Sequence, residues 1–465
     1  MITRSGVAAR LAAGFPWMLR AATLLAASVL ASPAVALTAS YGALLSSSYT
    51  NNFLLSATDE QDEWTQALEG NLTLSEKTRL IDANVSGSAG YYVYTKDTLA
   101  NEGIYFLNGN SVFTLRPGRL TWTLEDSLGE EAISTLAAGS RRNRQRVNVL
   151  STGPDLTFRL GQQNTMTMQG RWSRSTYSES EIDNTRLVGL ASLGYTYTSW
   201  LTLSLNGGAM QVEFDDDVTN ENFDRYDGFL LAQSRVSRTS IDISGGITRV
   251  KPDVSDDANE WRALLSIVHR SSNSLTLGFT SVRQASDSTL SFVSAAAGAG
   301  GATGGATSGT GTGTIVTGPS SPSDGTLSDS LTSAQAPVGD IFILLRHTLY
   351  GDYTAPDTRG RLTLYRESID YETSALDYDL TSASLRLTRT LTENWRGRFD
   401  ASYNYTDYGD IDRTDKDALV SFSADYVPAR NMLVSLFGSW TRRNSDVATQ
   451  EYRAYTVGIS LGYQK

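Results

Sequence analysis

The sequence predicts an all-β fold: a transmembrane antiparallel up-and-down β-barrel of about 20 strands that follows a cleaved signal peptide. Segment after segment alternates between apolar and polar side chains, which is typical of strands with two different faces. The connections between these segments alternate between short and long. After residue 36 no apolar stretch approaches the length of a membrane-spanning helix. Only a closed barrel then satisfies every backbone polar group in lipid.

Residues 1–36 predict a secretory signal peptide. They combine a basic start without acids, a short apolar stretch over 21–30 and the small-residue cleavage site Ala34-Val35-Ala36. The apolar stretch is shorter than the ~20 residues that a transmembrane helix needs. Residues 37–465 then form the mature barrel.

The alternation is clear at Trp395–Tyr405, where mostly aromatic positions alternate with polar ones. A soluble β-sandwich would show the same period. The length of the segments, often about ten to fourteen residues, favours the membrane, because soluble strands usually have ~5–6 residues and lipid-spanning strands ~9–11.

The pattern predicts 20 strands, at residues 41–49, 64–74, 78–93, 103–115, 118–127, 146–160, 163–176, 184–198, 199–213, 223–236, 238–251, 260–270, 273–284, 340–350, 358–368, 378–390, 393–407, 415–427, 430–443 and 450–463. Eighteen strands remain an alternative, because Pro154 interrupts one segment and proline cannot donate to a strand ladder. Short turns such as 75–77 and long connections such as 128–145 are typical of periplasmic turns and extracellular loops.

The two faces of the predicted strands suggest different roles for their side chains. Twenty strands enclose a cylinder ~35–40 Å across, which side chains alone cannot fill. The candidates for the lumen are Arg361, Arg386, Arg396, Arg398, Asp400, Asp242 and Asp425. They would either set the selectivity of a pore or stiffen the wall through ion pairs. The candidates for the aromatic girdle at the lipid interface are Trp395, Tyr403, Tyr405, Trp440 and Tyr463.

The segment 285–339 predicts a long extracellular loop, because residues 295–336 are rich in Gly, Ser, Thr and Ala. Such a composition lacks the apolar content to fold alone. The loop either folds inward and narrows the lumen or forms a disordered surface insert, and the composition favours the insert. No Gly-Lys-Ser/Thr follows the glycines, so nucleotide binding is unsupported.

Acidic residues dominate the charge and several predicted loops. The formal net charge of −11 argues against nucleic acid as a partner. The acidic loop residues are Asp59, Glu60, Asp62, Glu63, Asp215, Asp216, Asp217, Glu221, Asp253, Asp256, Asp257, Glu260, Asp407, Asp410 and Asp412. They could bind divalent cations specifically. The favoured interpretation is solvated loop tips bridged loosely to lipopolysaccharide, so outer-membrane lipid and lipopolysaccharide are the expected partners.

The sequence predicts no enzyme and no cofactor. It contains two histidines and no cysteine, so no transition-metal cluster is indicated. His269 falls at a predicted periplasmic turn, and His347 shares the parity of residues expected to face lipid. Neither stands beside a motif for a nucleophile that a histidine would activate.

Two short motifs resemble a known family. They are Tyr49-Thr50-Asn51-Asn52-Phe53 followed by Asp62, and Gly153-Pro154-Asp155-Leu156 followed by Arg159-Leu160-Gly161. With the overall layout, they resemble the outer-membrane β-barrel proteins associated with the PEP-CTERM and exopolysaccharide systems of Gram-negative bacteria. The resemblance implies an outer-membrane location, a role near surface-polysaccharide secretion, possible contacts with polysaccharide export components and no catalytic residues.

We therefore expect a pore or conduit in the outer membrane of a Gram-negative bacterium, linked to export of exopolysaccharide or another surface polymer. The alternative is a scaffold barrel that anchors envelope or polysaccharide machinery without open transport. The sequence leaves open the solute and whether the lumen is plugged.

Overall fold

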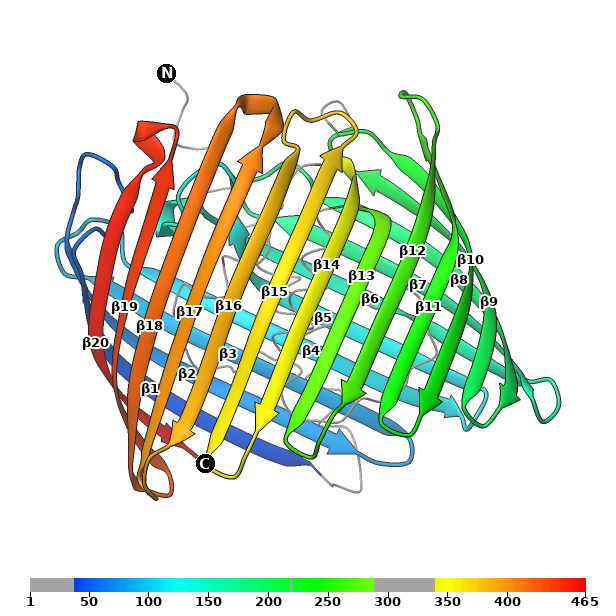
Figure 1. Cartoon of the computed structure of the whole chain (residues 1–465), viewed down its shortest axis with the longest axis horizontal. Coiled ribbons are helices and arrows are strands. Elements are labelled where there is room, and N and C mark those ends of the chain that lie inside the picture. The colour runs from blue at the N-terminus through cyan, green and yellow to red at the C-terminus, as the bar shows by residue number, and fades with distance from the viewer. Residues whose placement is uncertain (1–36, 218–219, 288–338) are drawn as a thin grey trace.

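The computed structural model describes residues 37–217, 220–287 and 339–465, which form one closed antiparallel sheet (Figure 1). The predicted signal peptide and residues 288–338 of the predicted loop lie outside the described residues. The strands are β1 Thr38–Thr50, β2 Glu63–Lys77, β3 Ile81–Tyr94, β4 Glu102–Arg116, β5 Leu120–Ala132, β6 Arg144–Arg159, β7 Asn164–Tyr177, β8 Asn184–Thr198, β9 Leu201–Phe214, β10 Phe223–Val236, β11 Thr239–Pro252, β12 Ala258–Arg270, β13 Leu275–Asp287, β14 Ile341–Thr354, β15 Thr358–Tyr371, β16 Tyr378–Thr390, β17 Trp395–Tyr408, β18 Arg413–Ala429, β19 Met432–Ser445 and β20 Tyr452–Gln464.

The sheet closes on itself because β1 pairs with β20, from Gly42 opposite Gln464 to Thr50 opposite Thr456. Every other strand pairs with its two neighbours in the chain. The prediction of a 20-stranded antiparallel barrel is confirmed, and the alternative of 18 strands is wrong. Closure removes the free edges that an open sheet of this size would expose.

Pro154 does not interrupt β6, and the neighbouring residues give the reason. A Cβ on Gly153 would lie 2.0 Å from the carbonyl oxygen of Gly170 on β7, so only glycine allows this close approach. Arg171 Nη1 donates hydrogen bonds to the carbonyl oxygens of Gly170, at 2.8 Å, and Pro154, at 3.2 Å. Arg171 also forms an ion pair of 2.7 Å with Asp155. A side chain therefore replaces the ladder bond that proline cannot make.

The barrel has two different rims. The short-turn rim, with connections of two to four residues such as 199–200, lies at the bottom of Figure 1, beside the C-terminus. The long-loop rim, with connections such as 51–62 and 133–143, lies at the top. By the usual pattern of outer-membrane barrels, the short turns face the periplasm.

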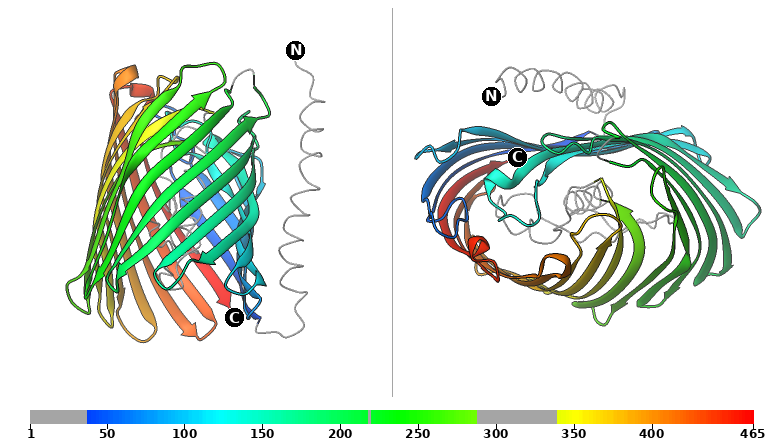
Figure 2. Two further views of the ribbon diagram at one scale, coloured as in Figure 1. Left: turned by 90° about the vertical axis from the view of Figure 1, so that its right-hand side faces the viewer. Right: turned by 90° about the horizontal axis from the view of Figure 1, so that it is seen from above.

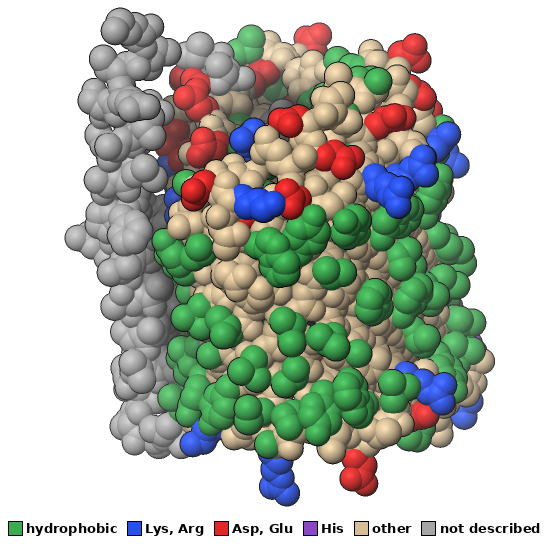
Figure 3. Space-filling model, turned by 90° about the vertical axis from the view of Figure 1, so that its left-hand side faces the viewer, with side chains coloured by type: hydrophobic (Ala, Val, Ile, Leu, Met, Phe, Trp, Pro, Cys, Tyr) green, Lys and Arg blue, Asp and Glu red, His purple; other side chains and the backbone are tan. Residues whose placement is uncertain are grey.

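The outer surface carries a belt of apolar side chains below a more charged long-loop rim (Figure 3). Side chains in this belt, such as Leu205, Ile247 and Phe422, are exposed although they are large and apolar. The polar partners of the alternation face the lumen. The described helices are three 3₁₀ turns, and none is long and apolar enough to cross a membrane.

The predicted loop boundary at residue 285 differs from the structure. β13 continues to Asp287, and β14 begins at Ile341. Residues 285–287, which the prediction placed in the loop, extend the β13 ladder opposite Ile343, Phe342 and Ile341 of β14.

Candidate functional site

The lumen wall of the short-turn half carries the charged residues expected there. Arg361, Arg386 and Asp400 lie opposite one another on β15, β16 and β17, so they share one face. Their chain neighbours Leu362 and Leu385 are exposed on the other, outward face. Three of the seven lumen candidates thus line one stretch of the inner wall.

Most of these candidates form ion pairs or hydrogen bonds. Arg361 Nε lies 2.5 Å from Asp352, and Arg386 Nε lies 2.6 Å from Asp400. These two contacts fit the interpretation as wall-stiffening ion pairs.

The remaining candidates also occupy inward-facing positions. Asp242 lies 2.6 Å from Arg235, and Asp425 accepts a hydrogen bond of 2.5 Å from Ser435 Oγ. Arg396 and Arg398 lie opposite Asp425 and Ser423 of β18. Arg396 is exposed to the lumen and forms no ion pair within the described residues, so it is a cation that a solute could reach.

The five girdle candidates lie on the outward face at two levels. Trp395 and Tyr463 lie at the short-turn end of their strands, and Tyr403, Tyr405 and Trp440 lie towards the long-loop end. All but Trp440 are exposed. Trp395 also packs on Tyr426, with ring centroids 4.9 Å apart.

The mouth at the long-loop rim differs from the rest of the lumen, because the tip of the β13–β14 hairpin is buried on both faces. We define this hairpin tip as Ala285–Asp287 of β13 and Ile341–Leu344 of β14. All seven residues are buried, whereas burial alternates along most of the other strands. From above, the ends of β13 and β14 lean inward from the ring of strands (Figure 2).

A buried ion pair joins the hairpin tip to the inner wall at β8. Arg186 of β8 donates two hydrogen bonds to Asp287, of 2.9 and 2.6 Å. The side chains of this pair are only 4% and 6% exposed. Arg225 of β10 donates a hydrogen bond of 2.9 Å to the carbonyl oxygen of Ala285. β13 thus contacts strands that are not its neighbours in the sheet.

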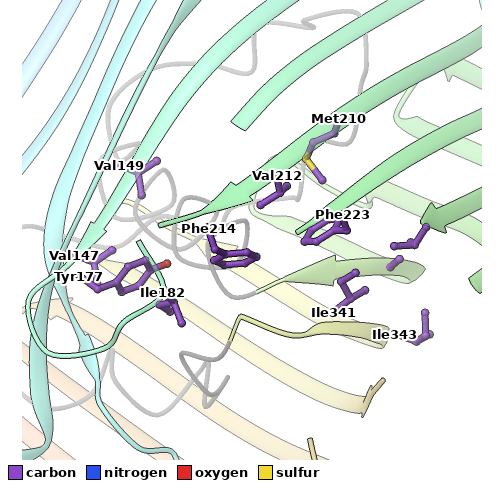
Figure 4. Close-up of a cluster of buried hydrophobic side chains, with 12 residues drawn as sticks. Val147, Val149, Tyr177, Ile182, Met210, Val212, Phe214, Phe223, Ile341 and Ile343 are labelled. Atoms are coloured by element: carbon purple, nitrogen blue, oxygen red, sulfur yellow. The ribbon is translucent and has the colours of Figure 1, made fainter. Parts of the chain in front are cut away.

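Apolar side chains surround this ion pair. One face of the tip, with Ala285, Ile341 and Ile343, belongs to a cluster formed with the inner wall (Figure 4). The wall residues of this cluster are Val147, Val149, Tyr177, Ile182, Met210, Val212, Phe214, Phe223 and Val250. The other face, with Phe342 and Leu344, packs on a second cluster formed by Ile369, Tyr371, Tyr378, Leu380 and Tyr408. The tip is thus held between two sides of the barrel by apolar packing.

A second element reaches into the mouth. The β5–β6 connection, residues 133–143, contacts strands far along the chain: Arg413 of β18 donates a hydrogen bond of 2.8 Å to the carbonyl oxygen of Leu136. Leu136 also packs against the second apolar cluster, and Ala138 packs against Tyr452 and Ala454 of β20. Asn143 fixes the shape of the connection by donating to the carbonyl oxygens of Ser134 and Ala138.

Both inward-leaning elements leave an incomplete seam in the wall. β12 and β13 pair only from Arg270 opposite Thr276 to Ala263 opposite Arg283, and β4 and β5 stop at Leu107 opposite Leu128. One arginine bridges each seam. Arg283 pairs with Glu260 at 2.7 Å, and Arg141 pairs with Glu130 and Glu102 at 2.7 and 3.2 Å.

The alternation pattern did not reveal the hairpin tip. A clue exists in the consecutive apolar residues Ile341-Phe342-Ile343-Leu344-Leu345, because a lipid-facing strand needs apolar residues at every second position only. A continuous apolar run is typical of a strand covered on both faces.

The acidic loop residues and the two histidines are the remaining candidates for metal binding or catalysis. Within the described residues, no group of three or more His, Cys, Asp or Glu side chains could hold a metal ion. Basic partners engage some of the loop acids: Asp62 lies 2.5 Å from Lys96, and Asp257 lies 2.5 Å from Arg249. His269 Nδ1 lies 2.9 Å from Thr239 Oγ1, and His347 lies opposite Arg366.

These features define an outer-membrane β-barrel with a porin-like fold. Residues 366–465 match the model of the family described as "Putative beta-barrel porin 2". No curated protein matches the chain.

Among solved structures, the siderophore receptor PirA from Pseudomonas aeruginosa is 10% identical, with 93% of this chain and 81% of that chain covered and a TM-score of 0.46. The siderophore receptor PirA from Acinetobacter baumannii is 9% identical, with 93% and 81% covered and a TM-score of 0.49. The copper transporter OprC is 11% identical, with 92% and 80% covered and a TM-score of 0.47.

Proposed function

We propose that the protein is a pore of the Gram-negative outer membrane whose long-loop mouth is closed, in the conformation described, by the hairpin tip. The observation that carries the proposal is the burial of both faces of this tip, one against the inner wall of β6–β11 and the other against the long-loop ends of β15–β17. The short-turn half keeps a polar, charged inner wall that water and solutes can contact.

If the tip moved outward, it would lose its contacts in the mouth and could form backbone hydrogen bonds with β12 instead. β12 ends its pairing with β13 at Ala263, so the backbone of the five residues 258–262 has no β13 partner. A tip that swung outward could complete this ladder and regain backbone hydrogen bonds. The loss of the Arg186–Asp287 pair would oppose the movement.

We further propose that the solute is an acidic surface polymer, such as an exopolysaccharide. The resemblance to exopolysaccharide-associated barrels supports this idea, and so does Arg396, an exposed lumen cation without an ion pair within the described residues. The scaffold alternative is favoured by the same closed mouth, because a permanently blocked barrel could only anchor partners.

Planar-bilayer conductance separates these functions. The wild-type barrel should show a low conductance with rare openings, and the variant Arg186→Ala/Asp287→Ala should raise the open probability several-fold. The matched control is Asp352→Ala/Arg361→Ala, a lumen ion pair of the short-turn half, which should leave the mouth closed.

Each contrary outcome has a clear meaning. A wild-type barrel with a large and constant conductance would contradict closure by the tip. A variant that folds but stays silent would refute the pore and leave the scaffold.

A further inference from the structure

Three cations gather on the outer surface of β18, β19 and β20, near the long-loop rim. Arg442 and Arg453 lie directly opposite each other in the β19–β20 ladder. Lys416 lies on the neighbouring strand, two residues before Ala418, which is the partner of Arg442. All three side chains are exposed. They share the outward face, because Trp440 and Tyr455, two residues away along the same strands, point outward as well.

Among the described residues, these cations have no acidic partner. Like charges directly opposite each other destabilise a strand pair. Within the described residues, Arg442 donates only to Asn444, at 2.8 Å, and the Lys416 ammonium lies 5.9 Å from the centre of the Tyr405 ring. None of the three cations belongs to an ion pair in that part of the chain.

Two other outward arginines near the same rim do have acidic partners. Arg174 lies 2.5 Å from Asp215, and Arg249 lies 2.5 Å from Asp257. The cluster on β18–β20 is therefore a local excess of positive charge, unlike the surroundings of these two arginines.

The depth of the cluster indicates what could neutralise it. Aromatic side chains lie beside and below the cluster: Tyr405 is opposite Lys416, and the pair Trp440 and Tyr455 lies two residues below Arg442 and Arg453. Further down, Leu436, Val457 and Ile459 are about half exposed, as expected against lipid chains. Figure 3 shows basic side chains immediately above the apolar belt. Aromatic residues mark the level of the lipid head groups, so the three cations reach that level or just above it.

We propose that Lys416, Arg442 and Arg453 bind the phosphate groups of a phosphorylated glycolipid in the outer leaflet. Guanidinium groups bind phosphate through paired, charge-assisted hydrogen bonds. The acyl chains of the same lipid would cover the apolar surface of β19 and β20 below. This inference concerns the outer surface and does not depend on whether the lumen conducts.

Native mass spectrometry of the full barrel, released from detergent with added lipid A, tests the proposal. Lipid A that carries both phosphates should bind the wild type, and Arg442→Ala/Arg453→Ala should weaken that binding at least tenfold. The control is Arg389→Ala, which removes an exposed, outward cation at the short-turn rim. It should leave the binding unchanged.

Two further arms identify the ligand. Dephosphorylated lipid A should bind the wild type as weakly as it binds the double variant. Inorganic phosphate alone should not bind the wild type at the concentrations at which the lipid binds. The conservative variant Arg442→Lys/Arg453→Lys should retain part of the affinity, and heat-modifiable gel mobility should confirm that every variant is folded. Equal binding by the double variant, or equal binding of the dephosphorylated lipid, would overturn the proposal.

Discussion

The two halves of the barrel use the same strands in different ways. In the short-turn half, β14 is part of a wall with lipid on one side and the lumen on the other, and its outward residues Leu349 and Tyr353 are exposed. In the long-loop half, the same strand leaves the wall, and four successive residues are buried. Alternation therefore reports the surroundings of a strand: it holds where the two faces meet different solvents and ends where protein covers both.

The stabilising interactions of the two halves differ in the same way. The ion pair Arg386–Asp400 of the short-turn half is partly open to the lumen, with the arginine side chain 44% exposed. The pair Arg186–Asp287 in the mouth is almost fully enclosed. Exposed pairs contribute little to stability, whereas a buried charge that loses its partner is costly.

The largest effect is expected from breaking the enclosed pair on one side only. Arg186→Ala removes the buried guanidinium that pairs with the Asp287 carboxylate, which should reduce the free energy of unfolding by about 3–5 kcal/mol. Arg186→Ala/Asp287→Ala should recover much of this loss, because no lone charge remains. Denaturant unfolding in lipid vesicles measures both, and Arg386→Ala, expected to cost at most about 1 kcal/mol, is the comparison from the other half. Equal losses in the free energy of unfolding for Arg186→Ala and Arg386→Ala would contradict the claim that the two halves are stabilised differently.

A somewhat smaller effect is expected from the apolar contacts. Phe342 is fully buried, and its ring packs on Tyr371 with centroids 5.2 Å apart. Phe342→Ala should cost about 3 kcal/mol, because the surrounding cluster cannot fill the cavity. Phe399, 39% exposed on the outward face, provides the matched control: Phe399→Ala should cost less, because lipid chains fill the space. The same unfolding experiment measures both, and a larger loss for Phe399→Ala would contradict the assignment of the two surfaces.

The smallest effect concerns an exposed ion pair at the long-loop rim and depends on pH. Hydrogen bonds from Arg174 lower the pKa of Asp215, which follows the end of β9. A depressed carboxyl pKa stabilises the folded state above the unfolded pKa of about 4, and this contribution is lost as the pH falls through the lower folded pKa.

Asp215→Asn should therefore flatten the fall in Tm between pH 6 and pH 3, by an amount equivalent to at most about 1 kcal/mol. Asp217→Asn, in the same connection, is the control. A fall in Tm that is equally steep in wild type and Asp215→Asn would show that Asp215 does not contribute to the pH dependence of stability.

Sequence reasoning reached the fold because the relevant pattern is local. The alternation at Trp395–Tyr405 and the short turns between long strands need only neighbouring residues, and both predicted the closed barrel. The same parity placed Arg361, Arg386 and Asp400 on one inner face. Pro154 led to the wrong alternative of 18 strands. Arg171, which compensates for the missing donor of this proline, lies on the next strand, so the local sequence around Pro154 does not reveal it.

For the strand segments that stay in the wall, the sequence by itself determined which side chains face lipid and which face the lumen, because a two-residue period between two different solvents leaves no other arrangement. Only the tertiary structure decided that the hairpin tip turns into the mouth. That choice depends on partners far apart in the chain, such as Arg186 and Asp287, which are 101 residues apart. Which distant residues meet is a property of the closed ring, and no local period encodes it.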